Sequence, residues 1–211
     1  MVSVSDTKRS KRFTTSEFRV AFPSLFQPRA VSEGKPAKYQ LIMLFPHSNA
    51  GLSELKKQFL AYAKEKFASD PTVYAAFLDA FKTKFPDMPE FVKGIRHPFK
   101  NGDDKPEWTG FPGCVYIRVS SNQKPGVVDA SVSEILDADE VYGGCYGKAS
   151  LNLYYYPPKD GGKPGINFGL NNFQKTRDGE PFGEFAKPED DFEALEEATA
   201  PAAADDDLAG L

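Results

Sequence analysis

Aromatic, basic and amide side chains alternate with small and apolar ones along residues 141–156. This alternation predicts a half-buried β-strand, because successive side chains of a strand point to opposite sides. The inner face would hold Gly147, Ala149, Leu151, Leu153 and Tyr155. The outer face would hold Tyr146, Lys148, Ser150, Asn152, Tyr154 and Tyr156. Tyrosine rings stack on nucleobases and a lysine contacts phosphates, so the outer face is a candidate surface for nucleic acid. An ordinary sheet with tyrosines on its outer side would give the same pattern.

The irregular segment 86–112 holds a second set of such residues. Its candidate contacts are Lys93, Arg96, Lys100, Trp108 and Phe111. Rings interleaved with cations suit a flexible single strand, whereas Trp108 and Phe111 could instead fill space beneath a long loop. A strand is predicted next, over 113–121. Its inner face would hold Val115, Ile117 and Val119, and its outer face Tyr116 and Arg118.

The sequence shows no clear catalytic site. Asp137, Asp139 and Glu140 are a weak magnesium signal, because nothing else supplies a nucleophile or a base. Both histidines adjoin a proline, and the two cysteines lack the spacing of a zinc site. The sequence therefore predicts no enzyme, no metal and no cofactor, and it interprets the acidic triplet as a solvated turn.

Charge divides the chain into two parts. All 26 lysines and arginines lie at or before Lys187, together with 21 of the 30 acids, so this body carries +5. The segment 188–211 carries −9 and is rich in alanine and proline, which predicts a disordered acidic tail. The body begins with a basic arm at 1–12, which either contacts phosphate or stays solvated. No apolar run is long enough to span a membrane, and we expect neither a membrane partner nor a signal peptide.

The remaining elements frame these candidates. A first strand is predicted over 13–22, with Phe18, Val20 and Phe22 on one side and Pro23 at its end. A central strand at 38–45 precedes an insertion of two helices at about 51–85, the first at 51–68 with Ser53 as a possible cap and the second at 70–84. A loop at 157–164 precedes the last strand at 165–175. The glycines at 143, 144 and 147 suggest a bulge of the kind that closes a small barrel.

The stretches VYGGCYGKASLNLYYYPP and GGKPGINFGLNNFQKTRDGEPFG, followed by the acids, resemble single-stranded-DNA-binding replication proteins of tailed phages. This resemblance implies a mainly β fold with inserted helices, namely an OB-like five-stranded Greek-key barrel over 1–187, followed by the tail. It also implies sequence-independent binding of single-stranded DNA in replication and recombination, in the cytoplasm of an infected bacterial host. Many such tails end in an aromatic residue, whereas this chain ends in Leu211.

The resemblance and the patterns together give a set of expected contacts. The expected DNA-binding residues are Lys93, Arg96, Lys100, Trp108, Phe111, Tyr116, Arg118, Tyr146, Lys148, Tyr154, Tyr156, Lys175 and Arg177. Three of the tyrosines, at 116, 146 and 154, are expected to share one surface with Arg118 and Lys148, because outward positions on neighbouring strands fall side by side.

We expect the tail to compete with DNA and to recruit a polymerase, helicase or primase. Its expected contacts are Asp205, Asp206, Asp207, Leu208 and Leu211. Duplex DNA is an expected further ligand once the tail is removed. Two other functions stay open: a protein-interaction module with a solubilising tail, and a metal-dependent nucleic-acid enzyme that uses the acidic triplet.

Overall fold

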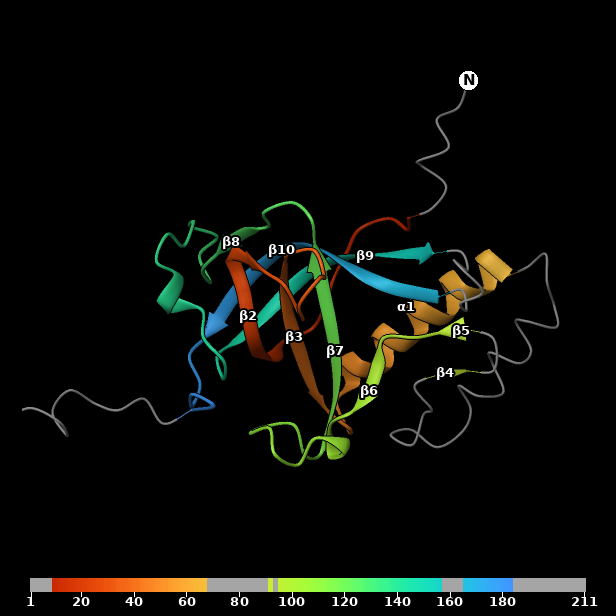
Figure 1. Cartoon of the computed structure of the whole chain (residues 1–211), viewed down its shortest axis with the longest axis horizontal. Helices are drawn as coiled ribbons and strands as arrows, with labels where there is room; N and C mark the ends of the chain where they lie inside the picture. Colours follow the sequence, from red (N-terminus) through yellow and green to blue (C-terminus); the bar gives the residue numbers. More distant parts are fainter. Residues whose placement is uncertain (1–8, 68–90, 93–94, 157–164, 184–211) are drawn as a thin grey trace, which may run out of the picture.

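The computed structural model describes residues 9–67, 91–92, 95–156 and 165–183 (Figure 1). Several sequence predictions lie outside these residues: the second helix, the loop at 157–164, the tail at 188–211 and the role of Lys93. The described part is mainly β, with helix α1 (Ala50–Phe67) as its long helix. No helix in it is long and apolar enough to cross a membrane.

Five long strands form a closed, OB-like barrel. They are β2 (Phe18–Arg29), β3 (Lys38–Pro46), β7 (Cys114–Ser121), β9 (Tyr146–Tyr156) and β10 (Gly165–Arg177). Antiparallel pairing joins β2 to β3, β3 to β7 and β9 to β10. The circuit closes because β10 also pairs with β7 in parallel and β9 pairs with β2. Closure removes exposed sheet edges and leaves an outer surface on which a ligand can lie.

Short strands and turns decorate this barrel. The strands are β1 (Phe13–Thr14), β4 (Phe91–Val92), β5 (Ile95–Arg96), β6 (Phe99–Asn101) and β8 (Gly126–Val128), and the 3₁₀ turns are η2 (Gly102–Asp104) and η3 (Ala138–Glu140). The first pairs with β9 and thereby ties the basic arm to the barrel. Strand β6 pairs with β7, and β8 pairs with β10.

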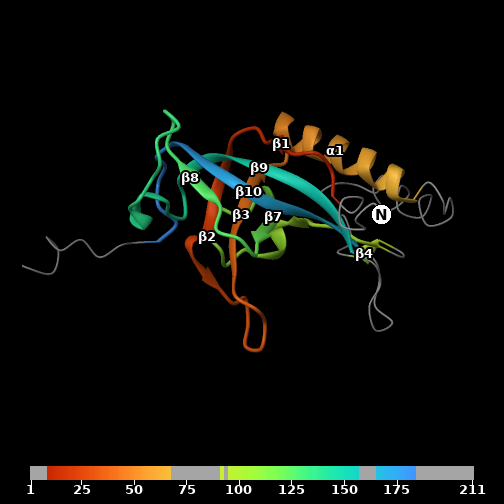
Figure 2. The same ribbon diagram turned by 90° about the horizontal axis from the view of Figure 1, so that it is seen from above.

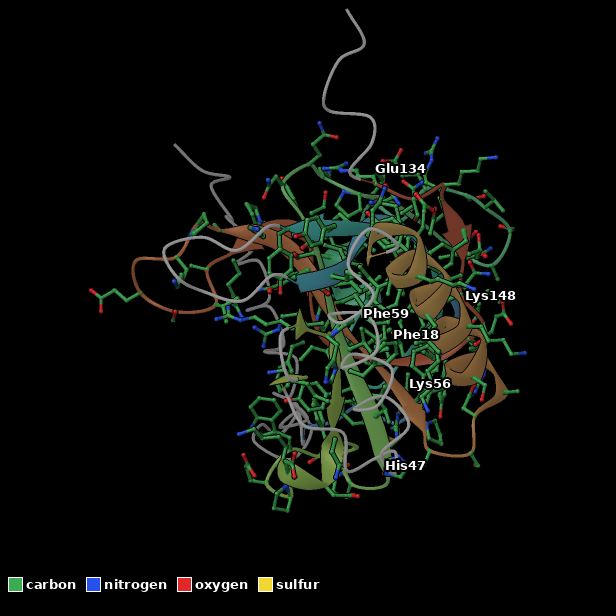
Figure 3. The ribbon with its side chains drawn as sticks, turned by 90° about the vertical axis from the view of Figure 1, so that its right-hand side faces the viewer. Phe18, His47, Lys56, Phe59, Glu134 and Lys148 are labelled. Carbon is green, nitrogen blue, oxygen red and sulfur yellow. The ribbon has the colours of Figure 1, made fainter. Side chains whose placement is uncertain are left out.

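The predicted alternation is confirmed in β7 and β9. The barrel interior contains the predicted inner residues of both strands, while Tyr155 is half-buried at its margin. Phe59 of α1 adds to this core through an edge contact with Phe99 and a tilted contact with Phe168, whose ring centroids lie 5.2 and 6.1 Å from its own. Figure 3 shows Phe18 and Phe59 near the centre of the molecule and Lys148 at its periphery.

Helix α1 confirms the first predicted helix, since its buried residues recur at intervals of three and four. It runs along β9 (Figure 1 and Figure 2). Its start differs from the prediction that Ser53 caps it. The helix begins at Ala50, and the Gly51 N–H donates to Asn49 Oδ1 at 2.7 Å. Asparagine is a favoured cap because its side chain satisfies a free N–H of the first turn.

The first strand differs from its prediction at Phe22. The prediction ended the strand at Pro23 and placed Phe22 beside Phe18 and Val20 in the core. Instead, β2 continues to Arg29, and its pairing with β3 shifts after Ala21. Phe22 has a φ of +46° and is 57% exposed. Proline lacks an N–H and restricts the residue before it, which favours a bulge here and turns the ring outward.

Candidate nucleic-acid interface

The bulge in β2 opens a groove on the outer face of β2, β3 and β7. This aromatic groove has a volume of about 210 Å³, and its lining includes Phe22, Ser24, Arg29, Gln40, Ile42 and Arg118. The hairpin between β2 and β3 projects from the body beside it (Figure 2). The groove therefore combines an exposed ring with two arginines, which is the pairing that binds bases and phosphates.

Phe22 rests on a small outer core. Its ring lies 5.3 Å from Trp108 in an edge contact and 6.0 Å from Phe111. Trp108 is half-buried, with Lys105 Nζ 5.1 Å from its ring centroid. Phe111 is only 1% exposed and packs with Ala21, Ile42 and Leu44. The prediction that Phe111 stacks on a base is therefore wrong, because both of its faces are enclosed by protein.

The segment that carries Trp108 and Phe111 is fastened to the barrel. Asp103 Oδ1 accepts the Gly113 N–H at 2.6 Å, and Oδ2 lies 3.4 Å from His47 Nε2. The Gly113 hydrogen bond is the main reason that the pKa of Asp103 lies below its usual range. These two contacts of Asp103 hold the segment that places Trp108 against Phe22. Tyr116 packs beside Phe111, at 5.2 Å between ring centroids, and is half-buried, whereas Arg118 is exposed.

A second, larger groove crosses β7, β10 and β9. This polar groove has a volume of about 650 Å³ and is lined mainly by hydroxyl, amide and basic side chains. Its cations are Arg9, Arg12, Lys38 and Lys124. No acid of the described residues lines the groove, and none of the ion pairs among them includes these four side chains. It is therefore a concentrated, uncompensated positive site that suits a polyanion.

The two grooves join along one row of residues. Cross-strand pairing links Ser24, Gln40, Ser120, Gly169 and Asn152 in that order. This row, which we call the track, crosses all five barrel strands at nearly right angles to them. Its members are small or uncharged, so it forms a low path between the aromatic groove and the polar groove.

Tyr154 stands at the far end of the track, in the wall of the polar groove. Arg9 forms an isolated bridge with it. Burial raises the pKa of Tyr154, and the charge of Arg9 opposes that rise. The ring of Tyr156 lies 6.3 Å from that of Tyr154, and burial raises the pKa of Tyr156 as well. Both hydroxyls are therefore neutral at physiological pH and do not repel phosphate.

Comparison with known proteins assigns the fold to a family. A family model described as the ssDNA-binding protein of Enterobacter phage Enc34 matches residues 11–207. The chain belongs to this family. The putative protein p50 of Acyrthosiphon pisum secondary endosymbiont phage 1 is 30% identical over 166 residues, which are 78% of this chain and 82% of that protein.

Two solved structures of phage proteins share the fold. The ssDNA-binding protein of bacteriophage Enc34, in complex with ssDNA, has a TM-score of 0.59 at 23% identity over 82% of this chain and 89% of that chain. The bacteriophage T7 protein gp2.5, a single-stranded DNA-binding protein, has a TM-score of 0.55 at 14% identity over 90% and 99% of the respective chains. The predicted family and the mainly β, OB-like fold are thus confirmed.

Within this Enc34-type barrel, three of the predicted contacts serve the fold itself. Lys175 Nζ lies 2.7 Å from Asp178 Oδ1, and the Lys175 side chain is only 14% exposed. Arg177 Nη2 lies 2.9 Å from Glu17 Oε1, and its guanidinium stacks 3.4 Å from the ring centroid of Tyr146. We call these five residues the paired end of β9 and β10. Its charges are neutralised and one face of Tyr146 is covered.

The three tyrosines of the predicted shared surface do not form one cluster. Tyr146 pairs with Arg177 and Tyr154 with Asn167, at opposite ends of the β9–β10 ladder. Eight residues of strand separate them, which corresponds to ~26 Å. Tyr116 lies on β7 beneath the segment with Phe111. Only Arg118 of this predicted set lines the aromatic groove, and only Tyr154 lines the polar groove.

The other predicted cations lie away from both grooves. Lys148 is exposed on the outer face of β9, Arg96 is exposed in β5, and Lys100 is half-buried in β6. The acidic triplet forms the exposed turn η3, in which Asp137 Oδ1 accepts the Asp139 N–H at 2.9 Å. No set of three metal-ligating side chains converges anywhere in the described ranges.

The sequence predictions missed five residues of the grooves: Phe22, Arg29, Lys38, Lys124 and Asn152. The Phe22–Pro23 pair carried a usable signal, because a proline inside a strand pattern marks an edge or a bulge. Arg9 and Arg12 were visible as a basic arm, but its pairing with β9 was not. Lys38 begins β3 and Lys124 lies in the turn between β7 and β8, so their convergence depends on how the strands pair.

Proposed function

We propose that this chain binds single-stranded DNA without sequence specificity, along the track and its two grooves. The observation that carries the proposal is the polar groove, where four cations face a common space that no acid in the described part of the chain lines. Family membership supports it, since the family model describes an ssDNA-binding protein. DNA replication and recombination in the cytoplasm of an infected bacterial host are the processes in which we place this binding.

Each part of the surface has a distinct task in this mechanism. The cations of the polar groove contact phosphates and release the counterions that surround DNA, which makes binding sensitive to salt. Phe22 offers its exposed ring to a base, and Arg29 and Arg118 lie beside it. Stacking tolerates every base because each has a π-face, so affinity comes without sequence selection. No step requires catalysis, a metal or a cofactor.

Titration of the full chain with oligo-dT, oligo-dC and mixed single strands, from about 50 to 200 mM salt, tests this function. We expect affinities that agree within about an order of magnitude and that fall steeply with salt. Matched duplex DNA and RNA serve as competitors. A strong preference for one defined sequence would contradict the proposal. Absence of binding to any single strand would favour a protein-interaction module instead.

We also propose that the acidic tail competes with DNA for the polar groove. The last described residues bring the chain to the outer core, where Arg19 lies 4.3 Å from the ring centroid of Phe182 and the Phe182 N–H donates to the Gly143 carbonyl. The described part of the chain thus ends beside the outer core, at Gly183, before the tail begins. Tethering gives such a segment an effective concentration of order mM, so its charge of −9 acts as a polyanion at the cations.

Bound DNA would displace the tail and free its end for a polymerase, helicase or primase. The residues proposed for that contact are Asp205, Asp206, Asp207, Leu208 and Leu211. Deletion of residues 188–211 should tighten ssDNA binding at low salt, reveal duplex binding and abolish partner binding. If the shortened chain binds ssDNA no better than the full chain at low salt, competition by the tail is excluded.

A further inference from the structure

Asn152 lies on the floor of the polar groove and has an amide without a partner. The residue is 5% exposed, and its Nδ2 atom finds no hydrogen-bond acceptor among the described residues. An unpaired buried amide destabilises a fold, and a leucine of similar volume would avoid that cost. The fold therefore tolerates a polar group that its own packing does not need.

The cross-strand neighbour of Asn152 has no side chain to hold its amide in one orientation. Its cross-strand partner is Gly169, and a Cβ atom there would lie 3.0 Å from Asn152 Oδ1 and 3.3 Å from Nδ2. Glycine thus removes the side chain that would pin the amide. The terminal torsion of asparagine is broad and roughly two-fold, so a half-turn exchanges the donor and the acceptor. No hydrogen bond of Nδ2 opposes this rotation.

We infer that Asn152 contacts the edge of a nucleobase held in the polar groove and does so for any base, an inference that rests on the proposed function. Base edges differ in their polar atoms: thymine O4 and guanine O6 accept, cytosine N4 donates, and adenine does both. An amide that turns at no cost meets each of them. Asn152 then adds affinity to the bound strand while preserving tolerance of sequence.

The position of Asn152 favours a base over a phosphate. Phosphates are met by the cations of the groove, whereas Asn152 is neutral and enclosed on its floor. Tyr154 follows two residues later on the same face of β9 and lines the same groove. Side chains two positions apart on one strand face stand ~7 Å from each other. A base stacked on Tyr154 therefore directs an edge toward Asn152.

The deciding variant is Asn152→Leu in the full chain, titrated with oligo-dT, oligo-dC, oligo-dA and a fully abasic strand of the same length. We expect affinity for all three base-bearing strands to fall by roughly five- to tenfold, the effect of losing one hydrogen bond. Affinity for the abasic strand and the slope of affinity against salt should not change. Thermal stability should stay the same or rise, because an unpaired buried amide is removed.

A matched control uses Asn171→Leu, since Asn171 lines the same groove but already donates to the Ser150 carbonyl at 3.3 Å. This variant should lose stability without a loss specific to base-bearing strands. Gly169→Ala provides a second test, because its methyl group restricts the Asn152 amide and should reproduce the base-dependent loss. That variant decides the matter if Asn152→Leu does not fold.

Four outcomes would overturn the inference: unchanged binding, equal loss on the abasic strand, loss confined to one base, or a marked fall in thermal stability. Failure of the proposed function has a different signature. In that case the unaltered chain itself would lack salt-sensitive ssDNA binding. If the unaltered chain binds and Asn152→Leu binds equally well, only the role of Asn152 is lost.

Discussion

The two ends of the β9–β10 ladder contain similar residues in opposite electrostatic situations. At the paired end, Lys175 and Arg177 are bound to acids and Arg177 covers the ring of Tyr146. At the other end, Tyr154 stands in a groove with Arg9 and three further cations, and the described residues that line that groove include no acid. Both ends place a tyrosine of β9 beside basic side chains, which come from β10 at the paired end and from the arm, β3 and the β7–β8 turn at the other end.

This difference separates cations that hold the fold from cations that remain available. Glu17 and Asp178 each lie outside the strands, and each neutralises one positive charge, that of Arg177 and Lys175 respectively. A phosphate arriving there would have to displace a carboxylate that is already tethered. The polar groove imposes no such competition, apart from the tail. The positions of the acidic residues, more than the number of lysines and arginines, therefore distinguish the proposed DNA interface from the rest of the surface.

The largest expected effect comes from removing the free cations. Alanine at Arg9, Arg12, Lys38 and Lys124 should weaken ssDNA binding by about 100-fold at low salt, if each charge contributes about 0.7 kcal/mol. The slope of log affinity against log salt should also fall by about 3, because each phosphate contact on a single strand contributes about 0.7. Fluorescence titration over a salt series measures both quantities.

The charge-matched control for this prediction is a pair of exposed lysines on α1. Lys57→Ala with Lys64→Ala removes the same charge as Lys38→Ala with Lys124→Ala, but from a surface outside both grooves. The α1 variant should bind nearly as the unaltered chain does. Equal losses from the two pairs would mean that total charge, and not the polar groove, governs binding.

Phe22 is expected to give the next largest effect. Phe22→Ala should reduce affinity for all homopolymers by about tenfold, because a stacked ring contributes ~1–3 kcal/mol per base. Phe22→Trp should retain most of the affinity. Tyr146→Ala is the matched control from the paired end, where Arg177 already covers the ring. A larger loss for Tyr146 than for Phe22 would reverse the assignment of the two surfaces.

Patterns confined to one element predicted the scaffold well. The inward residues of β7 and β9 and the buried face of α1 follow from periodicity, which is encoded within a few residues. The quoted stretches also led to the right family and the right barrel. Local sequence predicts which face of an element is buried, because each element must hide its apolar side.

Features that depend on distant residues escaped prediction. Glu17 and Arg177 are 160 residues apart, and nothing near Arg177 reveals that its charge is used. Phe111 looked like an exposed ring until the packing of its segment against Ile42 was known. The polar groove is lined by side chains from four strands and the basic arm. An error of one residue in the predicted strand register would therefore have placed other side chains in it. Only the bulge at Phe22 had a local signal, its following proline.

Neutralising the paired end should affect stability more than binding. Lys175→Ala with Arg177→Ala is expected to change ssDNA affinity by less than about threefold, since both charges are engaged by acids. The same variant should lower the thermal midpoint by a few degrees, roughly the effect of 1 kcal/mol in a domain of this size. Calorimetry and the salt-series titration test the two halves separately. A loss of affinity comparable to that of the polar-groove variant would show that the paired end contacts DNA.

The smallest expected effect is a pH dependence carried by Glu17. The Thr176 hydroxyl donates to Glu17 Oε2 at 2.6 Å, and this bond, together with Arg177, holds the pKa of Glu17 below its usual value. A carboxyl whose pKa is lower in the folded state stabilises the fold above its unfolded pKa, and that contribution is lost as the pH falls through the folded pKa.

Glu17→Gln should therefore lower the thermal midpoint at neutral pH by about 1–2 °C, as expected for a partly exposed ion pair. The difference between Glu17→Gln and the unaltered chain should shrink as the pH falls below the ordinary glutamate pKa of about 4.3, and it should disappear below the lowered pKa of Glu17 in the fold, where both side chains are uncharged. Thermal unfolding at a series of pH values checks the sign, and ssDNA affinity at neutral pH should be the same for both proteins. A midpoint difference that persists unchanged into acid would mean that Glu17 acts through shape, and the charge pairing at this end would lose its support.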